Sequence, residues 1–155
     1  MAGFMSGSKT RFLELTARQR RVAHELLAEV ALIEWQAYAE ARGTIRYSET
    51  VCGTRQIVDA QLPADAMASV SSGEGTMAVA ERYLEPIVAI YDDDLELPDT
   101  VEFAYYAIYN YFRKYAMSQE IDDWLIVNQA LASQADQDAW LPLLSRAIDA
   151  AREAG

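Results

Sequence analysis

The sequence predicts an all-α fold, a compact bundle of about six helices in one domain. Three observations predict it. Apolar residues recur at steps of three and four along most of the chain, which is the period of an α-helix. The strand pattern, in which apolar and polar residues alternate, is confined to residues 44–47. A length of 155 residues is also the usual size of one domain.

The N-terminal region predicts a leader followed by a long helix. Residues 1–10 contain several glycines and serines and are expected to be a flexible leader, so the domain covers 11–155. Thr16 followed by Gln19 is a capping box, and the helix that it begins continues to Gly43. The apolar face expected for this helix consists of Val22, Leu26, Val30, Ile33 and Ala37.

A second helix is expected from Ser48 to Leu62, where Pro63 would end it. After the glycine-rich loop at 71–75, one apolar pattern predicts the next helix, with a kink or restart at Pro86. The apolar positions of that pattern are Ala80, Tyr83, Leu84, Ile87, Val88 and Tyr91.

Three more helices are expected in the C-terminal third. Asp99 and Glu102 form a capping box for a helix that reaches Tyr115. Ser118 is expected to cap the following helix, and the last helix carries Pro142 in its first turns, where proline is tolerated.

Charge restricts the partners of this chain. The net charge is −11, and residues 74–112 hold nine acids against the single base Arg82. Nucleic-acid surfaces need clustered lysine and arginine, so a nucleic-acid partner is not expected. A field of one sign attracts basic proteins and speeds their association. Because we find neither a signal peptide nor a long apolar run, we expect a cytoplasmic protein that does not enter the membrane.

The inventory of reactive residues predicts no catalytic residue, no metal and no cofactor, and therefore no enzyme. His24 is the only histidine and Cys52 the only cysteine, which excludes zinc sites built from several of these ligands. A di-iron bundle needs Glu-x-x-His, but Arg21 stands three residues before His24. His24 lies off the expected apolar face, so we expect it to be half-buried or on the surface. General acid–base catalysis by two carboxylates that the fold brings together stays open as an alternative.

The acidic segment, residues 92–102, is the most distinctive candidate site. Its acids are Asp92, Asp93, Asp94, Glu96, Asp99 and Glu102. An EF-hand would need glycine and glutamate where Leu97 and Phe103 stand, so a solvated acidic loop or a non-standard calcium or magnesium site remains.

A tyrosine-rich helix follows this segment, with five tyrosines and Phe112 between residues 105 and 115. Aromatic residues all around a helix are typical of a central helix packed on several sides. The alternative is that Tyr106, Tyr109 or Tyr111 emerge beside the acids. Aromatic rings and carboxylates together would form an anchor surface for a basic protein, and these nine acids and tyrosines are the predicted partner-binding residues.

An acidic turn that leads into a tyrosine-rich helix, over residues 91–115 of a small acidic helical chain, resembles the immunity proteins of bacterial polymorphic and contact-dependent toxin systems. That resemblance implies a stoichiometric inhibitor of a toxin, often a basic nuclease, that works without a cofactor. Two alternatives stay open: a homo-oligomer subunit or adaptor, such as a homodimer, and an enzyme or ligand-binding bundle lined by carboxylates and tyrosines.

Overall fold

The computed structural model describes residues 2–48 and 54–155, with side chains described from residue 7 onward. It confirms the all-α class, because the chain is 72% helical and the described residues form seven α-helices and one two-stranded hairpin. The elements are α1 (Ala2–Leu13), α2 (Ala17–Arg42), β1 (Ile45–Ser48), β2 (Arg55–Val58), α3 (Leu62–Ser72), α4 (Thr76–Tyr91), α5 (Asp99–Tyr115), α6 (Asp123–Ala132), the 3₁₀ turn η1 (Gln137–Ala139) and α7 (Trp140–Glu153).

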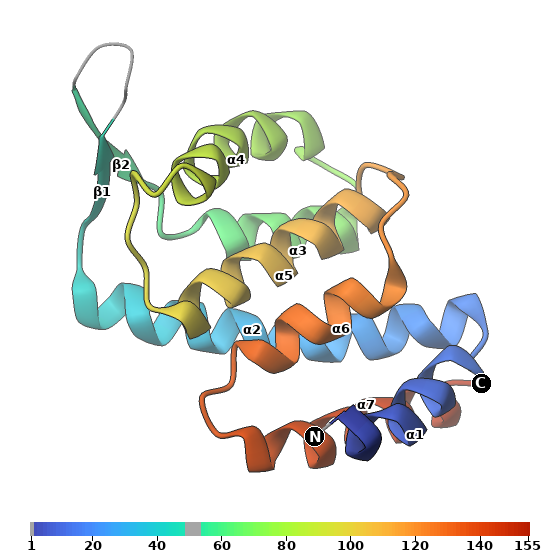
Figure 1. Cartoon of the computed structure of the whole chain (residues 1–155). Helices are drawn as coiled ribbons and strands as arrows, with labels where there is room; N and C mark the ends of the chain where they lie inside the picture. The colour runs from blue at the N-terminus through green and yellow to red at the C-terminus, as the bar shows by residue number, and fades with distance from the viewer. Residues whose placement is uncertain (1, 49–53) are drawn as a thin grey trace.

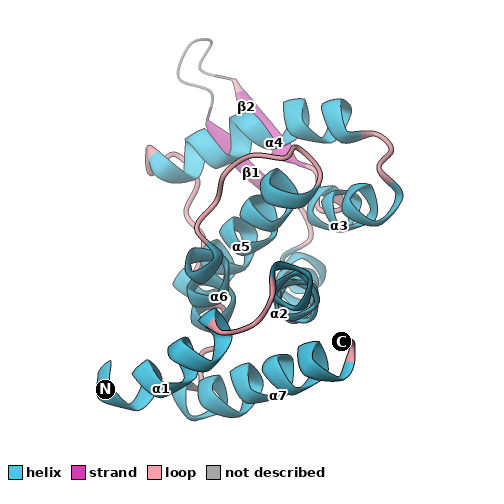
Figure 2. Cartoon of the chain, turned by 90° about the vertical axis from the view of Figure 1, so that its right-hand side faces the viewer, coloured by secondary structure: helices cyan, strands magenta, loops and turns pink. Residues whose placement is uncertain are grey.

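Helices α2 and α5 form the centre of the molecule (Figure 1). Helix α2 packs against α5, α6 and α7, and α5 also packs against α6 and α3. The hairpin and α4 lie at one end of the molecule, whereas α1 and α7 lie together at the opposite end (Figure 2). Helix α4 is therefore an outer helix, covered from below by α3 and α5.

Helix α2 begins as predicted, at the capping box. The backbone N–H of Gln19 donates to the Thr16 hydroxyl at 3.2 Å, and the Thr16 N–H donates to the Gln19 side-chain oxygen at 2.9 Å. Gly43 ends the helix with a φ of 79°, a conformation in which a side chain would be strained. These contacts satisfy backbone groups that a helix end otherwise leaves without partners.

The predicted apolar face of α2 is only partly right, because Val22, Leu26 and Val30 are half-buried against the core but the other two residues are not buried. Ile33 is 66% exposed and Ala37 is also exposed. The buried positions are Ala23, His24, Leu27, Ala28, Ala31, Trp35 and Ala39. Small alanines allow helix axes to approach closely, so the side of α2 that is rich in alanine faces α5 and α7, and larger aliphatic groups such as Ile33 remain outside.

The helix predicted over Ser48–Leu62 does not form in the described part of that range. Residues 55–58 are strand β2, which pairs antiparallel with β1 so that Ile45 lies opposite Val58, while 49–53 lie outside the described residues. Pro63 stands in the first turn of α3 instead of ending a helix. Proline is tolerated there because the first backbone N–H groups of a helix have no intrahelical acceptor.

Three further local predictions need correction. Helix α4 continues through Pro86 as one element, so the predicted restart is absent. The Asp99–Glu102 capping box is absent, because α5 begins at Asp99 itself and Pro98 occupies the N-cap without a side-chain hydrogen bond. Asp122, not Ser118, caps α6, and its carboxylate accepts from the Trp124 N–H. Pro142 does lie in the first turn of α7 as predicted.

A flexible leader was expected at residues 1–10, but the described residues of that range, 2–10, belong to helix α1, which spans Ala2–Leu13. Ser8 and Phe12 of this helix are buried. The Phe12 ring lies 5.5 Å from the His24 ring and 5.9 Å from the Trp124 ring, measured between centroids. Helix α1 also packs against α7, so this part of the chain contributes to the core.

An aromatic cluster joins α2, α4 and α5 at the middle of the core. The Tyr105 ring lies 4.9 Å from Trp35 and 4.6 Å from Tyr83, in tilted arrangements between centroids. The Tyr83 hydroxyl donates to the Tyr105 carbonyl at 3.1 Å, and the Trp35 indole donates to the Ala60 carbonyl at 2.9 Å. Nine of the seventeen residues of α5 are buried, so α5 is a central helix packed on several sides.

Candidate functional site

The acidic segment links the end of α4 to the start of α5 (Figure 1). Asp92, Asp93, Glu96 and Asp99 are exposed, whereas Asp94 and Glu102 are half-buried. Leu95 is buried beneath the segment, and the N–H groups of Asp94 and Leu95 both donate to the Ala89 carbonyl, at 2.8 and 3.2 Å. The acids are therefore displayed on a backbone that is fixed to α4.

The start of α5 provides an aromatic support beside these acids. The ring of Tyr91, the last residue of α4, stacks on Tyr106 at 5.0 Å between centroids with an interplanar angle of 17°. The Tyr106 hydroxyl donates to the Glu102 carboxylate at 2.9 Å. Burial, followed by this hydrogen bond and the Glu102 charge, raises the pKa of Tyr106 above its usual value. Tyr106 thus stays neutral and supports the exposed ring of Tyr91 from below.

The three tyrosines predicted to bind a partner lie in different places. Tyr106 lies beside the acidic segment but is buried. Tyr109 is half-buried, stacks on Tyr83 at 4.7 Å, and has the Arg113 guanidinium 5.3 Å from its centroid. Tyr111 is buried, and burial together with the charges of Glu25 and Glu29 raises its pKa. The expectation that these rings emerge is therefore wrong for Tyr106 and Tyr111, because α5 is central and its rings fill the core.

The exposed apolar residues near the acids come from α4 instead. Leu84, Val88 and Tyr91, which belong to the apolar pattern that predicted this helix, are all exposed. Helix α4 carries apolar side chains on more of its circumference than the core can cover, and Tyr83 and Ile87 take the inner positions. The sequence signal for this exposed side is that α4 has more apolar residues than one buried face of a helix can hold.

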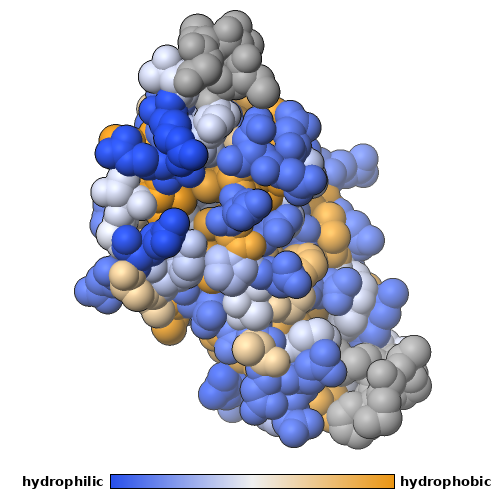
Figure 3. Space-filling model, turned by 60° about the vertical axis from the view of Figure 1, so that its left-hand side comes forward, coloured by the Kyte–Doolittle hydropathy of each residue, from blue (hydrophilic) through white to orange (hydrophobic). Residues whose placement is uncertain are grey.

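Apolar and hydrophilic groups alternate on the face shown in Figure 3. Apolar patches lie open between hydrophilic side chains on this face. Large apolar groups next to charges of one sign are typical of protein-binding surfaces, whereas single exposed apolar residues are ordinary.

His24 is fully buried, contrary to the expectation of a half-buried or surface histidine. Its Nε2 lies 2.8 Å from the Asp123 carbonyl and its Nδ1 lies 2.7 Å from the Tyr115 hydroxyl. A carbonyl only accepts, so Nε2 carries the proton and Nδ1 accepts from Tyr115. Burial lowers the pKa of His24 to about 4, although the contact with Asp123 and its charge oppose the effect. His24 is a neutral hydrogen-bonding group between α2, α5 and α6.

A charged cluster lies next to His24. The Asp123 carboxylate is 3.0 Å from Arg20 and 2.8 Å from Lys114. Burial alone would raise the pKa of Asp123, but the hydrogen bonds from Lys114 and Arg20 outweigh it and hold the pKa below its usual value. A surface hollow of about 430 Å³ beside Asp123 is lined by Lys114 and residues 120–123. The cluster joins three helices, and both cations compensate the charge of the one carboxylate.

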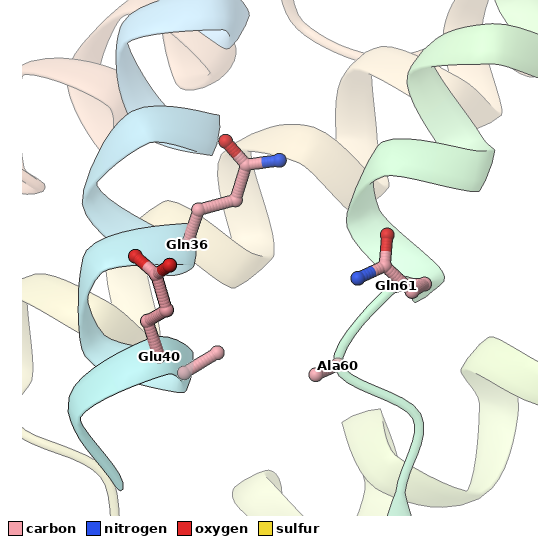
Figure 4. A pocket seen from close by; sticks show the side chains of 5 residues that line it. Gln36, Glu40, Ala60 and Gln61 are labelled. Atoms are coloured by element: carbon pink, nitrogen blue, oxygen red, sulfur yellow. The ribbon is translucent and has the colours of Figure 1, made fainter. Parts of the chain in front are cut away.

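Two other hollows lie near the hairpin end. One of about 320 Å³ lies between α2 and the segment before α3, where Gln36 and Glu40 face Gln61 across the opening (Figure 4). The other, about 340 Å³, lies between the hairpin and α4, and Arg82 forms part of its lining.

Arg82 is held by two acids in this second hollow. It lies 2.8 Å from Asp59 and 2.7 Å from Asp65, and the hydrogen bond that it donates to Asp65 contributes most to raising its pKa. The only base within residues 74–112 is thus already paired, and it does not offset the acids of α4 and the acidic segment.

The described residues contain no group of three or more His, Cys, Asp or Glu side chains placed to hold a metal ion. Over the same residues, no helix combines the length and the apolarity needed to cross a membrane. Comparison with protein-family models, with curated proteins and with solved structures gives no match for this chain. What is established is the class: an all-α protein with a small hairpin and an acidic, partly apolar surface along α4 and residues 92–102.

Proposed function

We propose that this chain is a protein-binding module that inhibits a basic protein by stoichiometric binding, in the manner of an immunity protein. One observation carries the proposal: exposed apolar side chains and uncompensated acids coincide on α4 and the acidic segment. Apolar contact supplies binding free energy, and charge of one sign supplies partner selection and rapid encounter.

The charge of this surface supports a basic partner. Asp92, Asp93, Glu96 and Asp99 are exposed, and Arg82 is engaged by Asp59 and Asp65. Several like charges within about one Debye length, roughly 10 Å at 0.1 M salt, add to a negative potential at the surface. A partner with lysines and arginines at its own active site or substrate face would be drawn to this surface and covered by it.

The aromatic group at the centre of the surface supports a specific contact. Tyr91 is 67% exposed, but its ring is fixed by stacking on Tyr106, which Glu102 holds by a hydrogen bond. A ring that is already ordered before binding loses little conformational entropy on contact, and exposed aromatics are common binding anchors.

The test is capture of a partner by the immobilised full chain from a lysate of the source cells, followed by measurement of association rates with the purified partner. A variant Asp92→Lys, Asp93→Asn, Asp94→Lys should slow association by about tenfold or more at low salt. Asparagine is used at 93 because this residue has a φ of 62°, which asparagine tolerates much better than lysine.

The matched control is Glu14→Lys, Asp138→Asn, Glu153→Lys, which changes the net charge equally. These three acids are exposed and belong to the end of the molecule that carries α1 and α7. Equal slowing by both variants would refute steering by the acidic segment. Failure to recover any partner at low ionic strength would refute the inhibitor. A native mass that is a multiple of 17.3 kDa, formed by this chain alone, would also refute it and favour a homo-oligomer.

A further inference from the structure

The outer side of α4 carries an apolar stripe of four exposed residues. Met77 is 68% exposed, Leu84 55%, Val88 46% and Tyr91 67%. Spacings of seven, four and three residues place them on one face of a helix. Fourteen residues of helix rise about 21 Å, so the stripe follows nearly four turns of α4.

The rest of the chain covers α4 from the other side only. Val79, Tyr83, Ile87 and Ile90 are buried and face the interior, and α4 contacts α3, α5 and β1. In Figures 1 and 2, α4 is the outermost helix at its end of the molecule. None of the elements in the described parts of the chain lies over the stripe.

One flank of the stripe is acidic. Glu81, Glu85 and Asp92 are exposed and lie on the side of the helix that is nearer to the hairpin. Glu85 accepts a hydrogen bond from Tyr47 of the hairpin at 3.2 Å. Arg82 points away from the stripe, toward Asp59 and Asp65. The stripe therefore combines a linear apolar contact with negative charges along its edge.

We propose that the α4 stripe is the docking site of an amphipathic helix of the partner, with apolar residues at helical spacing and lysines or arginines along its flanks. This inference deepens the proposed inhibitor function and rests on it. A straight stripe of four helical turns matches the apolar face of a second helix, which is recognised through residues three, four and seven apart. The basic flanks of that helix would meet Glu81, Glu85 and Asp92.

Two other occupants fit the charges less well. A second copy of this chain also carries a net charge of −11, and an antiparallel pair of α4 helices would bring the acidic flanks together. A membrane surface is usually anionic, and amphipathic helices that bind it carry lysine or arginine beside their apolar face, where α4 carries glutamate and aspartate.

The probe is a fluorescein-labelled 18-residue peptide with leucines on one helical face and lysines and arginines on both flanks. Two control peptides are used: the same composition in shuffled order, and the same leucine pattern with glutamate on the flanks. Fluorescence anisotropy with the full chain at 50 mM salt should show binding of the basic amphipathic peptide at least about tenfold tighter than of either control.

The variant Leu84→Glu, Val88→Glu should weaken this binding by about tenfold or more, because it places charge in the middle of the apolar contact. The matched control is Ile33→Glu, Leu125→Glu, which changes two exposed apolar residues on α2 and α6. Circular dichroism should show unchanged helicity in both variants, since all four side chains are at the surface.

Three results would overturn the docking site: equal binding of the basic and shuffled peptides, equal loss in the two variants, or a dimer of this chain that the Leu84→Glu, Val88→Glu variant dissociates. Preferential sedimentation with vesicles of anionic phospholipid would also overturn it in favour of a membrane surface. Peptide binding without any captured partner would keep the docking site and refute the inhibitor. A captured partner whose binding is insensitive to Leu84→Glu, Val88→Glu would keep the inhibitor and refute the docking site.

Discussion

Protonation of His24 is expected to destabilise the fold as the pH falls. The ring is fully buried, with Nε2 donating to the Asp123 carbonyl and Nδ1 accepting from Tyr115. Burial lowers its pKa from 6.5 to about 4, and the neighbouring charges of Arg20 and Lys114 act in the same direction while Asp123 opposes them. The folded state therefore holds a neutral ring at a pH where the unfolded chain has already taken up a proton.

The sign and size follow from proton linkage. Between pH 6.5 and about 4 the unfolded chain binds one more proton than the folded chain at this residue, so the free energy of unfolding decreases as the pH falls. For one group with these two pKa values the loss is roughly 1 kcal/mol by pH 5.5 and roughly 2 to 3 kcal/mol by pH 4.5. Above pH 7 the contribution no longer changes.

Urea unfolding followed by circular dichroism, at several pH values between 8 and 4.5, measures this loss. Other groups also titrate in the acid range, so the comparison is with His24→Gln, whose amide can donate and accept but does not titrate. The difference between the two proteins should shrink as the pH falls. Because His24 is the only histidine, its ring protons can also be followed directly by NMR. Parallel stability curves, or an NMR midpoint near 6.5, would refute a buried neutral imidazole.

Two further substitutions test the packing. Tyr105→Phe should raise the free energy of unfolding by about 1 kcal/mol, because the buried Tyr105 hydroxyl has no hydrogen-bond partner among the described residues. Tyr83→Phe should lower the free energy of unfolding by a similar amount, because it removes the hydrogen bond to the Tyr105 carbonyl. Thermal unfolding would register each as a shift of about 2–4 °C, and a lower melting temperature for Tyr105→Phe would contradict the assignment. Ala31→Leu should cost about 1–3 kcal/mol in urea unfolding because Ala31 is fully buried, while Ala37→Leu should change stability little; equal effects would show that α2 packs through another face.

The positions of several helices could be predicted from local sequence because their signals are local. The Thr16–Gln19 capping box, the glycines between helices and the proline in the first turn of α7 act through neighbouring backbone groups. The alternating pattern at residues 44–47 overlaps β1, but β2 was missed because a strand of four residues is too short for a clear pattern.

The candidate surface was predicted only in part, since exposure depends on neighbouring elements. The acids at 92–102 are at the surface as charged residues usually are, with Asp92 exposed and Asp94 half-buried. Tyr106 and Tyr111 are buried because α5 is the central helix. Leu84 is exposed because α4 has neighbours on one side only.

The sequence by itself determined the all-α class, the acidity of the chain and its concentration between residues 74 and 112, because periodicity and charge are properties of the amino acids themselves. Only the tertiary structure decided which apolar face of each helix is buried. The inner face of α2 is the side rich in alanine, where α5 and α7 can approach closely, and the larger Ile33 is left outside. On α4 the same selection leaves Leu84 and Val88 uncovered beside the acids. Which apolar groups a chain buries is settled by how its helices pack together, and that packing is what created the surface proposed here to bind a partner.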